Sequence, residues 1–208
     1  MRDLFQLAGV VLGKNVLDVG FRDVQELQEL ALLVGLAGSV FGIDINPENV
    51  QSASKKLASL SPNIHVKKGS VSAIPLDDCS FDLVLCKGVL HEVKQLEKVF
   101  SEMARVCKRD GFLIIIDLQR FSRLRFIPYR FIVRLFGRHC DDVHPGFTRE
   151  QLLKLLAHVQ FEEILYQQLP DKGRLGFNEV NLFLLKAKQT SQFKNLDLAI
   201  PVNFCDTF

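Results

Sequence analysis

A chain of 208 residues with 48% hydrophobic and 24% charged side chains has the size and composition of one globular domain, which excludes a disordered or low-complexity protein. The net charge of +2 is too small to indicate nucleic-acid binding through bulk electrostatics, so we expect no nucleic-acid partner. The five cysteines are scattered without a Cys-x-x-Cys pair, which predicts reduced thiols and excludes a disulfide framework or a zinc site.

The N-terminus carries an acid at Asp3 and only a short apolar run, so we expect no signal peptide. No stretch of the sequence reaches the length of a membrane span. Together with the cysteine pattern, these features predict a cytoplasmic protein.

From residue 15 onward, short runs rich in strand-forming residues alternate with segments of helical spacing. The runs are NVLDVG, SVFGID, NIHVKKG, FDLVLC and FLIIID. Asn46 followed by Pro47 predicts a helix start, with the helix continuing to about Leu60. Between Val93 and Val106 apolar residues recur every three or four positions, which indicates one buried helix face. The alternation predicts an α/β fold: a Rossmann-like, mostly parallel sheet with helices on both faces.

The last third of the chain continues this pattern. Thr148 and Gln151 are spaced as a capping box before the helical run LLKLLAHV. Two strand-like runs follow, FEEILYQQL and VNLFLLKAK, joined by the turn-rich segment PDKGRLGFNE. We therefore expect a single domain over residues 1–188 and a tail of unknown role over 189–208.

Acidic residues stand where two of the expected strands end. Asp18 and Gly20 close the first strand, and Asp44 closes the second. Ligands of open α/β sheets bind beyond the carboxyl ends of the strands, where an acid is placed to accept the hydroxyl groups of a ribose. The alternative for Asp44 is a simple helix-start residue beside Asn46.

Two longer stretches, GSVSAIPLDDCSFDLVLCKGVLHEV and SEMARVCKRDGFLIIID, complete a recognisable pattern with Asp18, Gly20 and Asp44. Together they resemble the class I S-adenosylmethionine-dependent methyltransferases, most closely the small-molecule branch that includes the quinone-biosynthesis enzymes. The similarity covers about residues 14–118 and, more weakly, 144–188. It implies a seven-stranded sheet whose last strand is antiparallel, S-adenosyl-L-methionine as cofactor and a small-molecule methyl acceptor.

The resemblance also implies where the cofactor would lie. The first loop would hold the methionine end, and Asp44 the ribose. Ile45 would pack on the face of the adenine, with Ser70 and Val71 beside it. The end of the fourth strand would line the mouth of methyl transfer, at Cys86, Lys87 and Gly88.

The sequence departs from the family pattern at two positions of the first loop and one beyond it. Arg22 and Val24 replace the second and third glycines, which predicts strain if either must adopt positive φ. Ser70 stands where an acid commonly accepts a hydrogen bond from the adenine. Arg22 has two possible roles: it could pair with the carboxylate of the cofactor, or it could turn towards Asp18 and neutralise it. We predict the second.

Among the histidines, His91 is the best candidate for a catalytic base, because it follows the fourth strand and its pKa is near neutrality. A base is needed if the acceptor arrives protonated. The alternative is that His91 and Glu92 simply begin the next helix. We expect no metal site, because His139 and His144 flank CDDV without a known ligand spacing.

An inserted segment over residues 118–147 is rich in arginine and aromatic side chains. Arg130, Arg134 and Arg138 are spaced four apart, which places them on one helical face. The position suggests a cover over a lipophilic or anionic substrate, or a membrane-surface contact through 123–138. A solvated basic face or a dimer contact is the alternative.

Two functions compete at this point. The first is methyl transfer from S-adenosylmethionine to a small apolar or anionic acceptor. The second is a catalytically inactive, methyltransferase-like binding module that acts through its surface or a membrane contact. The altered first loop favours the second, whereas Asp18, Asp44 and the LHEV segment favour the first.

Overall fold

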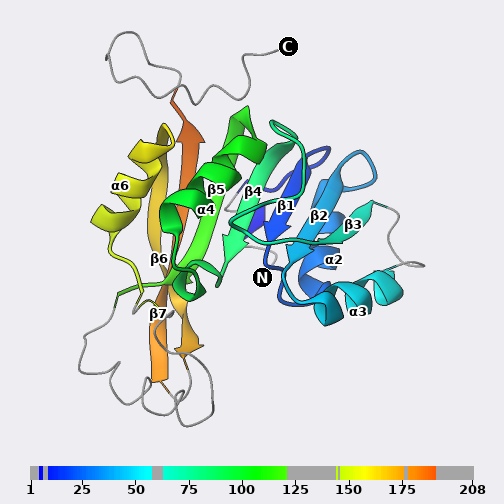
Figure 1. The fold of residues 1–208 in the computed structure, drawn as a ribbon, viewed down its shortest axis with the longest axis horizontal. Helices are drawn as coiled ribbons and strands as arrows, with labels where there is room; N and C mark the ends of the chain where they lie inside the picture. Colours follow the sequence, from blue (N-terminus) through cyan, green and yellow to red (C-terminus); the bar gives the residue numbers. More distant parts are fainter. Residues whose placement is uncertain are drawn as a thin grey trace.

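A computed structural model describes residues 5–6, 9–57, 63–120, 144, 146–175 and 178–190 of the chain. Within these ranges the chain folds into one seven-stranded sheet with the strand order β3-β2-β1-β4-β5-β7-β6 (Figure 1). The strands are β1 (Asn15–Val19), β2 (Ser39–Asp44), β3 (Ile64–Lys68), β4 (Phe81–Lys87), β5 (Cys107–Leu118), β6 (Phe161–Leu175) and β7 (Asn178–Gln189). β7 pairs antiparallel with both β5 and β6, and the other strand pairs are parallel, so the predicted sheet is confirmed.

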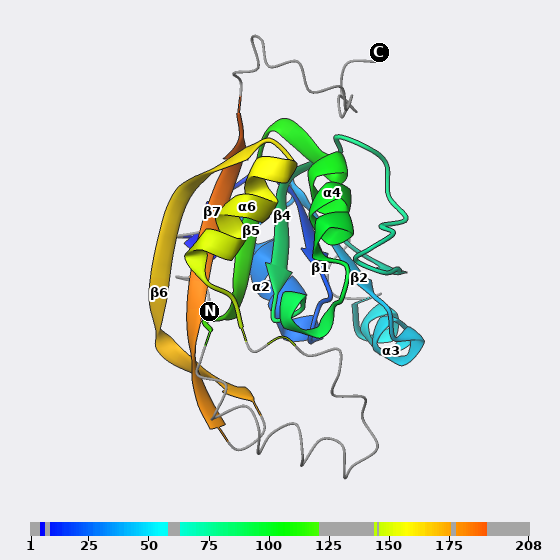
Figure 2. The ribbon, with the colours of Figure 1, turned by 60° about the vertical axis from the view of Figure 1, so that its left-hand side comes forward.

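Helices cover both faces of the sheet. The first face carries α4 (Leu96–Val106) and α6 (Arg149–His158), and the opposite face carries α2 (Val24–Val34) and α3 (Pro47–Leu57). Figure 2 shows α4 and α6 in front of the sheet and α2 behind it. None of these helices has the length and hydropathy that a membrane-spanning helix requires.

Successive side chains of the central strands point to opposite faces of the sheet, so each face has its own hydrophobic core. On β4, Val84 packs under α4 and α6, whereas Leu83 and Leu85 pack under α2. β5 repeats the pattern with Ile115 on one side and Ile114 on the other. Because both faces are covered, the inner strands read as almost continuous apolar runs in the sequence.

The boundaries of three elements bear on the predictions. Thr148 and Gln151 form both hydrogen bonds of a capping box, so that prediction is confirmed. The helix predicted from Val93 begins instead at Leu96, because a 3₁₀ turn, η1 (Leu90–Glu92), precedes it and Val93 is extended. The end predicted for α3 near Leu60 lies outside the described residues, and the described helix runs to Leu57.

The hairpin of β6 and β7 is longer than predicted. The segment PDKGRLGFNE was expected to be a turn, but β6 continues to Leu175 and β7 begins at Asn178. Pairing continues to Leu175 and Asn178, past the point where Leu118 of β5 pairs with Leu182. The hairpin therefore extends beyond the end of β5, as Figure 1 shows. The arginine segment and the C-terminal tail fall mainly on residues 121–143 and 191–208, outside the described residues.

Candidate functional site

The carboxyl ends of four parallel strands meet at one edge of the sheet. Asp18 on β1 lies in register with Gly42 on β2 and Leu85 on β4. Beyond the strands the register continues through backbone hydrogen bonds, from Gly20 N to the carbonyl of Ile43 at 2.7 Å and from Gly88 N to the carbonyl of Ile116 at 2.8 Å. The strand order reverses between β1 and β4, which is where ligands of open α/β sheets bind.

The first loop turns from β1 into α2 without the strain predicted for it. Gly20 adopts φ +76°, but neither Arg22 nor Val24 is among the described non-glycine residues with positive φ. Asp23 caps α2 instead, accepting a hydrogen bond from Glu26 N at 2.9 Å. The strain was expected only if Arg22 or Val24 adopted positive φ, and that condition is not met, since α2 begins directly after this cap.

Three ionisable side chains cluster beneath the first loop. Asp18 and Glu26 are both buried, with 1% and 3% exposure, and Lys87 binds Glu26 with 2.8 Å between Nζ and Oε1. Burial raises the pKa of Asp18 well above its usual value, the charge of Glu26 raises it further, and Lys87 acts in the opposite direction.

Arg22 does not take the place predicted for it. Its side chain is exposed, and the cation that acts on Asp18 is Lys87 from the neighbouring strand. The prediction that Arg22 neutralises Asp18 is wrong, because the chain turns away after Gly20. Among the described residues, Asp18 Oδ2 has no hydrogen-bond partner.

Asp44 lies at the end of β2, half-buried, and its Oδ1 accepts a hydrogen bond from Asn46 N at 2.7 Å. Asn46 in turn accepts from Glu48 N at 2.9 Å and begins α3. Asp44 thus makes the helix-start contact that was the alternative reading. A carboxylate accepts several hydrogen bonds, so this contact is compatible with a ligand role as well. Ile45, next to it, is 69% exposed.

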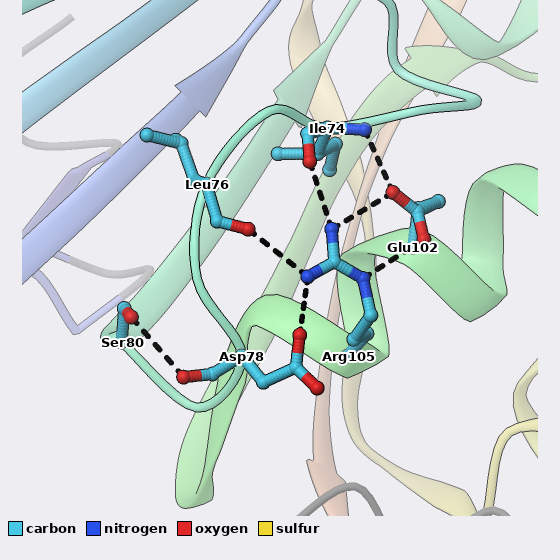
Figure 3. A network of polar contacts seen from close by, with 6 residues as sticks. All are labelled: Ile74, Leu76, Asp78, Ser80, Glu102 and Arg105. Carbon is cyan, nitrogen blue, oxygen red and sulfur yellow. Dashed lines mark hydrogen bonds and ion pairs between the residues drawn. The ribbon is translucent and has the colours of Figure 1, made fainter.

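The loop between β3 and β4 carries Ser70 and Val71, and α4 fixes its course. Arg105 donates to the carbonyls of Ile74 at 2.8 Å and Leu76 at 3.0 Å, and it also binds the carboxylates of Asp78 and Glu102 (Figure 3). The hydrogen bonds from Arg105 hold the pKa of Glu102 below its usual range. This network was missed from the sequence, because its partners lie about 30 residues apart.

Ser70 and Val71 lie at the start of this braced loop. The hydroxyl groups of Ser70 and Ser72 are 2.9 Å apart, and Val71 packs against the core on the α4 side. Both residues are half-buried and follow Gly69, whose N donates to the carbonyl of Asp44 at 3.0 Å. The contact places this loop beside the end of β2.

Cys86, Lys87 and Gly88, at the end of β4, were predicted to line one site, but they lie in different environments. Cys86 is fully buried in the core, and burial raises the pKa of its thiol, so its side chain does not line an open site. Lys87 is half-buried against Glu26, and Gly88 is exposed. Cys86 and Cys107 are free thiols, which agrees with the prediction of reduced cysteines for these two residues.

His91 pairs with Asp117. The sequence analysis identified His91 as a candidate base but did not identify Asp117. His91 Nδ1 lies 2.7 Å from Oδ1 of Asp117, which is fully buried at the end of β5. Burial lowers the pKa of His91, but the hydrogen bond to Asp117 and the charges of Asp117 and Glu92 outweigh it, so the pKa is raised. Asp117 stands at the end of the apolar run FLIIID. An acid at the end of such a buried strand is the sequence feature that could have marked Asp117 as a candidate site residue.

The inserted segment leaves and rejoins the sheet beside this pair. Phe147 N donates to the carbonyl of Leu118 at 2.9 Å, and Arg120 N donates to the carbonyl of Phe147 at 3.0 Å. His144 N donates to the carbonyl of His91 at 2.7 Å. The residues that flank the arginine-rich segment therefore lie at the end of β5 and beside η1. Across the described ranges, no three His, Cys, Asp or Glu side chains lie where they could hold a metal ion.

The fold and the acids at its strand ends define an α/β protein built to bind a nucleotide-like ligand. A family model described as "Methyltransferase domain" matches residues 17–115. The chain is 36% identical over 150 residues to a demethylmenaquinone methyltransferase of Lactobacillus johnsonii, covering 66% of this chain and 60% of that protein. It is 29% identical over 143 residues to the enzyme of the same name from Geobacillus stearothermophilus, covering 66% and 61%.

Solved structures agree on the fold. A SAM-dependent methyltransferase from Aquifex aeolicus superposes with a TM-score of 0.64 at 24% identity, over 89% of this chain and 87% of that one. These findings support a class I S-adenosylmethionine-dependent methyltransferase, and the cofactor that this family implies is S-adenosylmethionine. The chain spans less than two thirds of the length of the two curated relatives.

Proposed function

We propose that the protein transfers a methyl group from S-adenosylmethionine to a small-molecule acceptor that loses a proton as it is methylated. The observation that carries this proposal is the His91–Asp117 pair, with its 2.7 Å contact, at the ends of β4 and β5. β4 also borders β1, whose Asp18 belongs to the proposed cofactor site.

The cofactor would lie across the ends of β1 and β2. Oδ2 of Asp18 is buried without a partner among the described residues, and a cationic amino group would satisfy it. Asp44 would accept the ribose hydroxyls, and Ile45, with 69% exposure, would cover one face of the adenine. The braced loop would place Ser70 and Val71 along the edge of the base.

His91 would act as the base. Methyl transfer from a sulfonium is an in-line displacement, so the protein mainly orients the reactants and accepts the released proton. Asp117 Oδ1 also accepts a hydrogen bond from Leu118 N at 2.7 Å, and a carboxylate oxygen can accept a second hydrogen bond from Nδ1–H of His91. This tautomer leaves the lone pair on Nε2 for the acceptor.

We propose an apolar or anionic acceptor. The curated relatives are named for demethylmenaquinone, so an analogue of it is the first acceptor to test. We propose that the arginine-rich segment, which lies in the sequence between Arg120 and His144, covers such a molecule, because its flanking residue His144 donates from its backbone N to the carbonyl of His91.

Calorimetric titration tests the proposal without a known acceptor. S-adenosylmethionine and S-adenosylhomocysteine should both bind, and Asp44→Ala should weaken both by about tenfold or more, since charge-assisted hydrogen bonds of roughly 1.5–3 kcal/mol are lost. Glu48→Ala, which removes an exposed acid from the first turn of α3, is the matched control and should bind normally. No heat from wild type at millimolar ligand would support the inactive binding module instead.

A further inference from the structure

A second histidine lies beside His91, at the point where the chain rejoins the sheet after the arginine-rich segment. His144 N donates to the carbonyl of His91 at 2.7 Å. Phe147 N donates to the carbonyl of Leu118 at 2.9 Å. His91 is itself held by Asp117, the residue before Leu118. Both histidines are therefore fixed at the same end of β5.

A close backbone contact sets the position of His144. Gly146 adopts φ +87°, and a Cβ at this residue would lie 2.7 Å from the carbonyl oxygen of Gln119 and 2.8 Å from that of Leu118. Both the conformation and the close approach favour glycine. The chain that carries His144 is therefore held against the end of β5 by its own backbone.

The imidazole of His144 packs on a phenylalanine ring. The ring centroids of His144 and Phe147 are 5.5 Å apart, with 37° between the planes. Phe147 is buried in the core on the α4 and α6 side, whereas His144 is half-buried. Among the described residues, neither ring nitrogen of His144 makes a hydrogen bond or an ion pair, so both nitrogens can bind a ligand.

The proposed base cannot orient an acceptor alone. His91 uses Nδ1 for Asp117 and has only Nε2 for the acceptor, while Oε1 of Glu92 lies 3.8 Å from Nε2, beyond hydrogen-bond distance. A single contact fixes one atom of a bound molecule but lets the molecule rotate about it. In-line displacement needs the reacting atom to be aligned with the methyl group, so the acceptor needs a second point of attachment.

We propose that His144 is this second point of attachment: its ring forms a hydrogen bond with a second polar group of the acceptor, while His91 takes the proton. The inference rests on the proposed function, because it presumes that His91 is the base. It narrows the acceptor to a molecule with two polar groups, such as a ring with two hydroxyl groups. It excludes an acceptor whose only polar atom is the one that loses the proton.

Replacement by phenylalanine isolates the two ring nitrogens. His144→Phe keeps a ring against Phe147, and kcat/KM for the acceptor should fall by about threefold to tenfold, the range for one hydrogen bond. The acceptor is a reduced short-chain analogue of demethylmenaquinone, which carries two ring hydroxyls. The affinity for S-adenosylhomocysteine should stay within about twofold of wild type, a difference smaller than one lost hydrogen bond. The pH dependence of kcat should not move, because His91 and Asp117 are intact.

His65→Phe is the matched control. His65 packs on Phe41 with 4.7 Å between the ring centroids and 38° between the planes, close to the geometry of His144 on Phe147, but it lies on β3 at the edge of the sheet. This variant should change neither kcat/KM nor the affinity for S-adenosylhomocysteine. His144→Gln, which keeps a donor and an acceptor, should recover part of the loss seen in H144F.

The outcomes separate the two proposals. If wild type does not bind S-adenosylhomocysteine, the proposed function itself fails and the inference falls with it. If wild type binds it, the inference is overturned by a wild type that does not methylate the analogue, by unchanged kcat/KM in H144F, or by an equal loss in H65F. Two further results overturn it: a cofactor affinity that falls in H144F as much as kcat/KM does, which indicates a structural role, and a shifted pH dependence of kcat, which would make His144 the base.

Discussion

Arg105→Met removes the guanidinium that braces the β3–β4 loop and keeps most of the apolar stem of the side chain. Arg105 is 17% exposed and donates two hydrogen bonds to the backbone, at Ile74 and Leu76, besides its contacts with two carboxylates. A net hydrogen bond contributes about 0.5–1.5 kcal/mol, and a partly exposed ion pair contributes about 0–1 kcal/mol. We therefore expect the free energy of unfolding to fall by about 1–5 kcal/mol for two hydrogen bonds and two ion pairs.

Urea denaturation followed by circular dichroism measures this change. The midpoint should fall while the slope with urea stays constant, because the surface exposed on unfolding is unchanged. Affinity for S-adenosylmethionine should also fall, since the loop carries Ser70 and Val71. The control is Lys154→Met, which breaks an exposed pair with Glu150 on α6 and should change neither quantity. A loss below about 0.5 kcal/mol for Arg105→Met would mean that the network does not brace the loop.

Two further predictions concern His91 and Gly20. Asp117→Asn should lower the pKa of His91 in an NMR titration and decrease kcat. The pair also makes stability depend on pH. Because the folded pKa of His91 is raised, the pair stabilises the fold most below the unfolded pKa of about 6.5, and this stabilisation is lost as the pH rises through the folded pKa. An unchanged pKa of His91 in this variant would exclude the hydrogen bond between His91 and Asp117. Gly20→Ala should destabilise the protein by about 1 kcal/mol or more in urea, because Gly20 has φ +76° and a new Cβ would lie 2.5 Å from Val89 Cγ2; wild-type stability would show that the turn can rearrange.

The sheet could be predicted from the sequence because it depends on local patterns. Apolar runs bounded by turn residues gave all seven strands, and the helix-start residues Asn46 and Thr148 were read correctly. The hairpin length could not be predicted, since pairing between β6 and β7 overrode the turn-forming residues at 170–179.

The candidate site was less predictable because its contacts are not local. Proximity in sequence suggested that Arg22 would pair with Asp18, but the cation near Asp18 comes from β4, which only the fold brings close. Glu26 reads as an ordinary exposed helix residue, and nothing in its neighbours indicates its 3% exposure. Asp18, Asp44 and Asp117 all stand at or near strand ends, which is the feature of these acids that the sequence alone can show.

The strand order has a consequence for synthesis on the ribosome. Among the described residues β7 is the last strand in sequence, yet it lies between β5 and β6 in the sheet. Until residues 178–189 have emerged, β6 has no neighbour and one edge of β5 is open, so the nascent chain can complete only five adjacent parallel strands. Exposed strand edges invite pairing with other chains. The interval before β7 is inserted is therefore when this protein is most exposed to aggregation, and when a chaperone would protect it most.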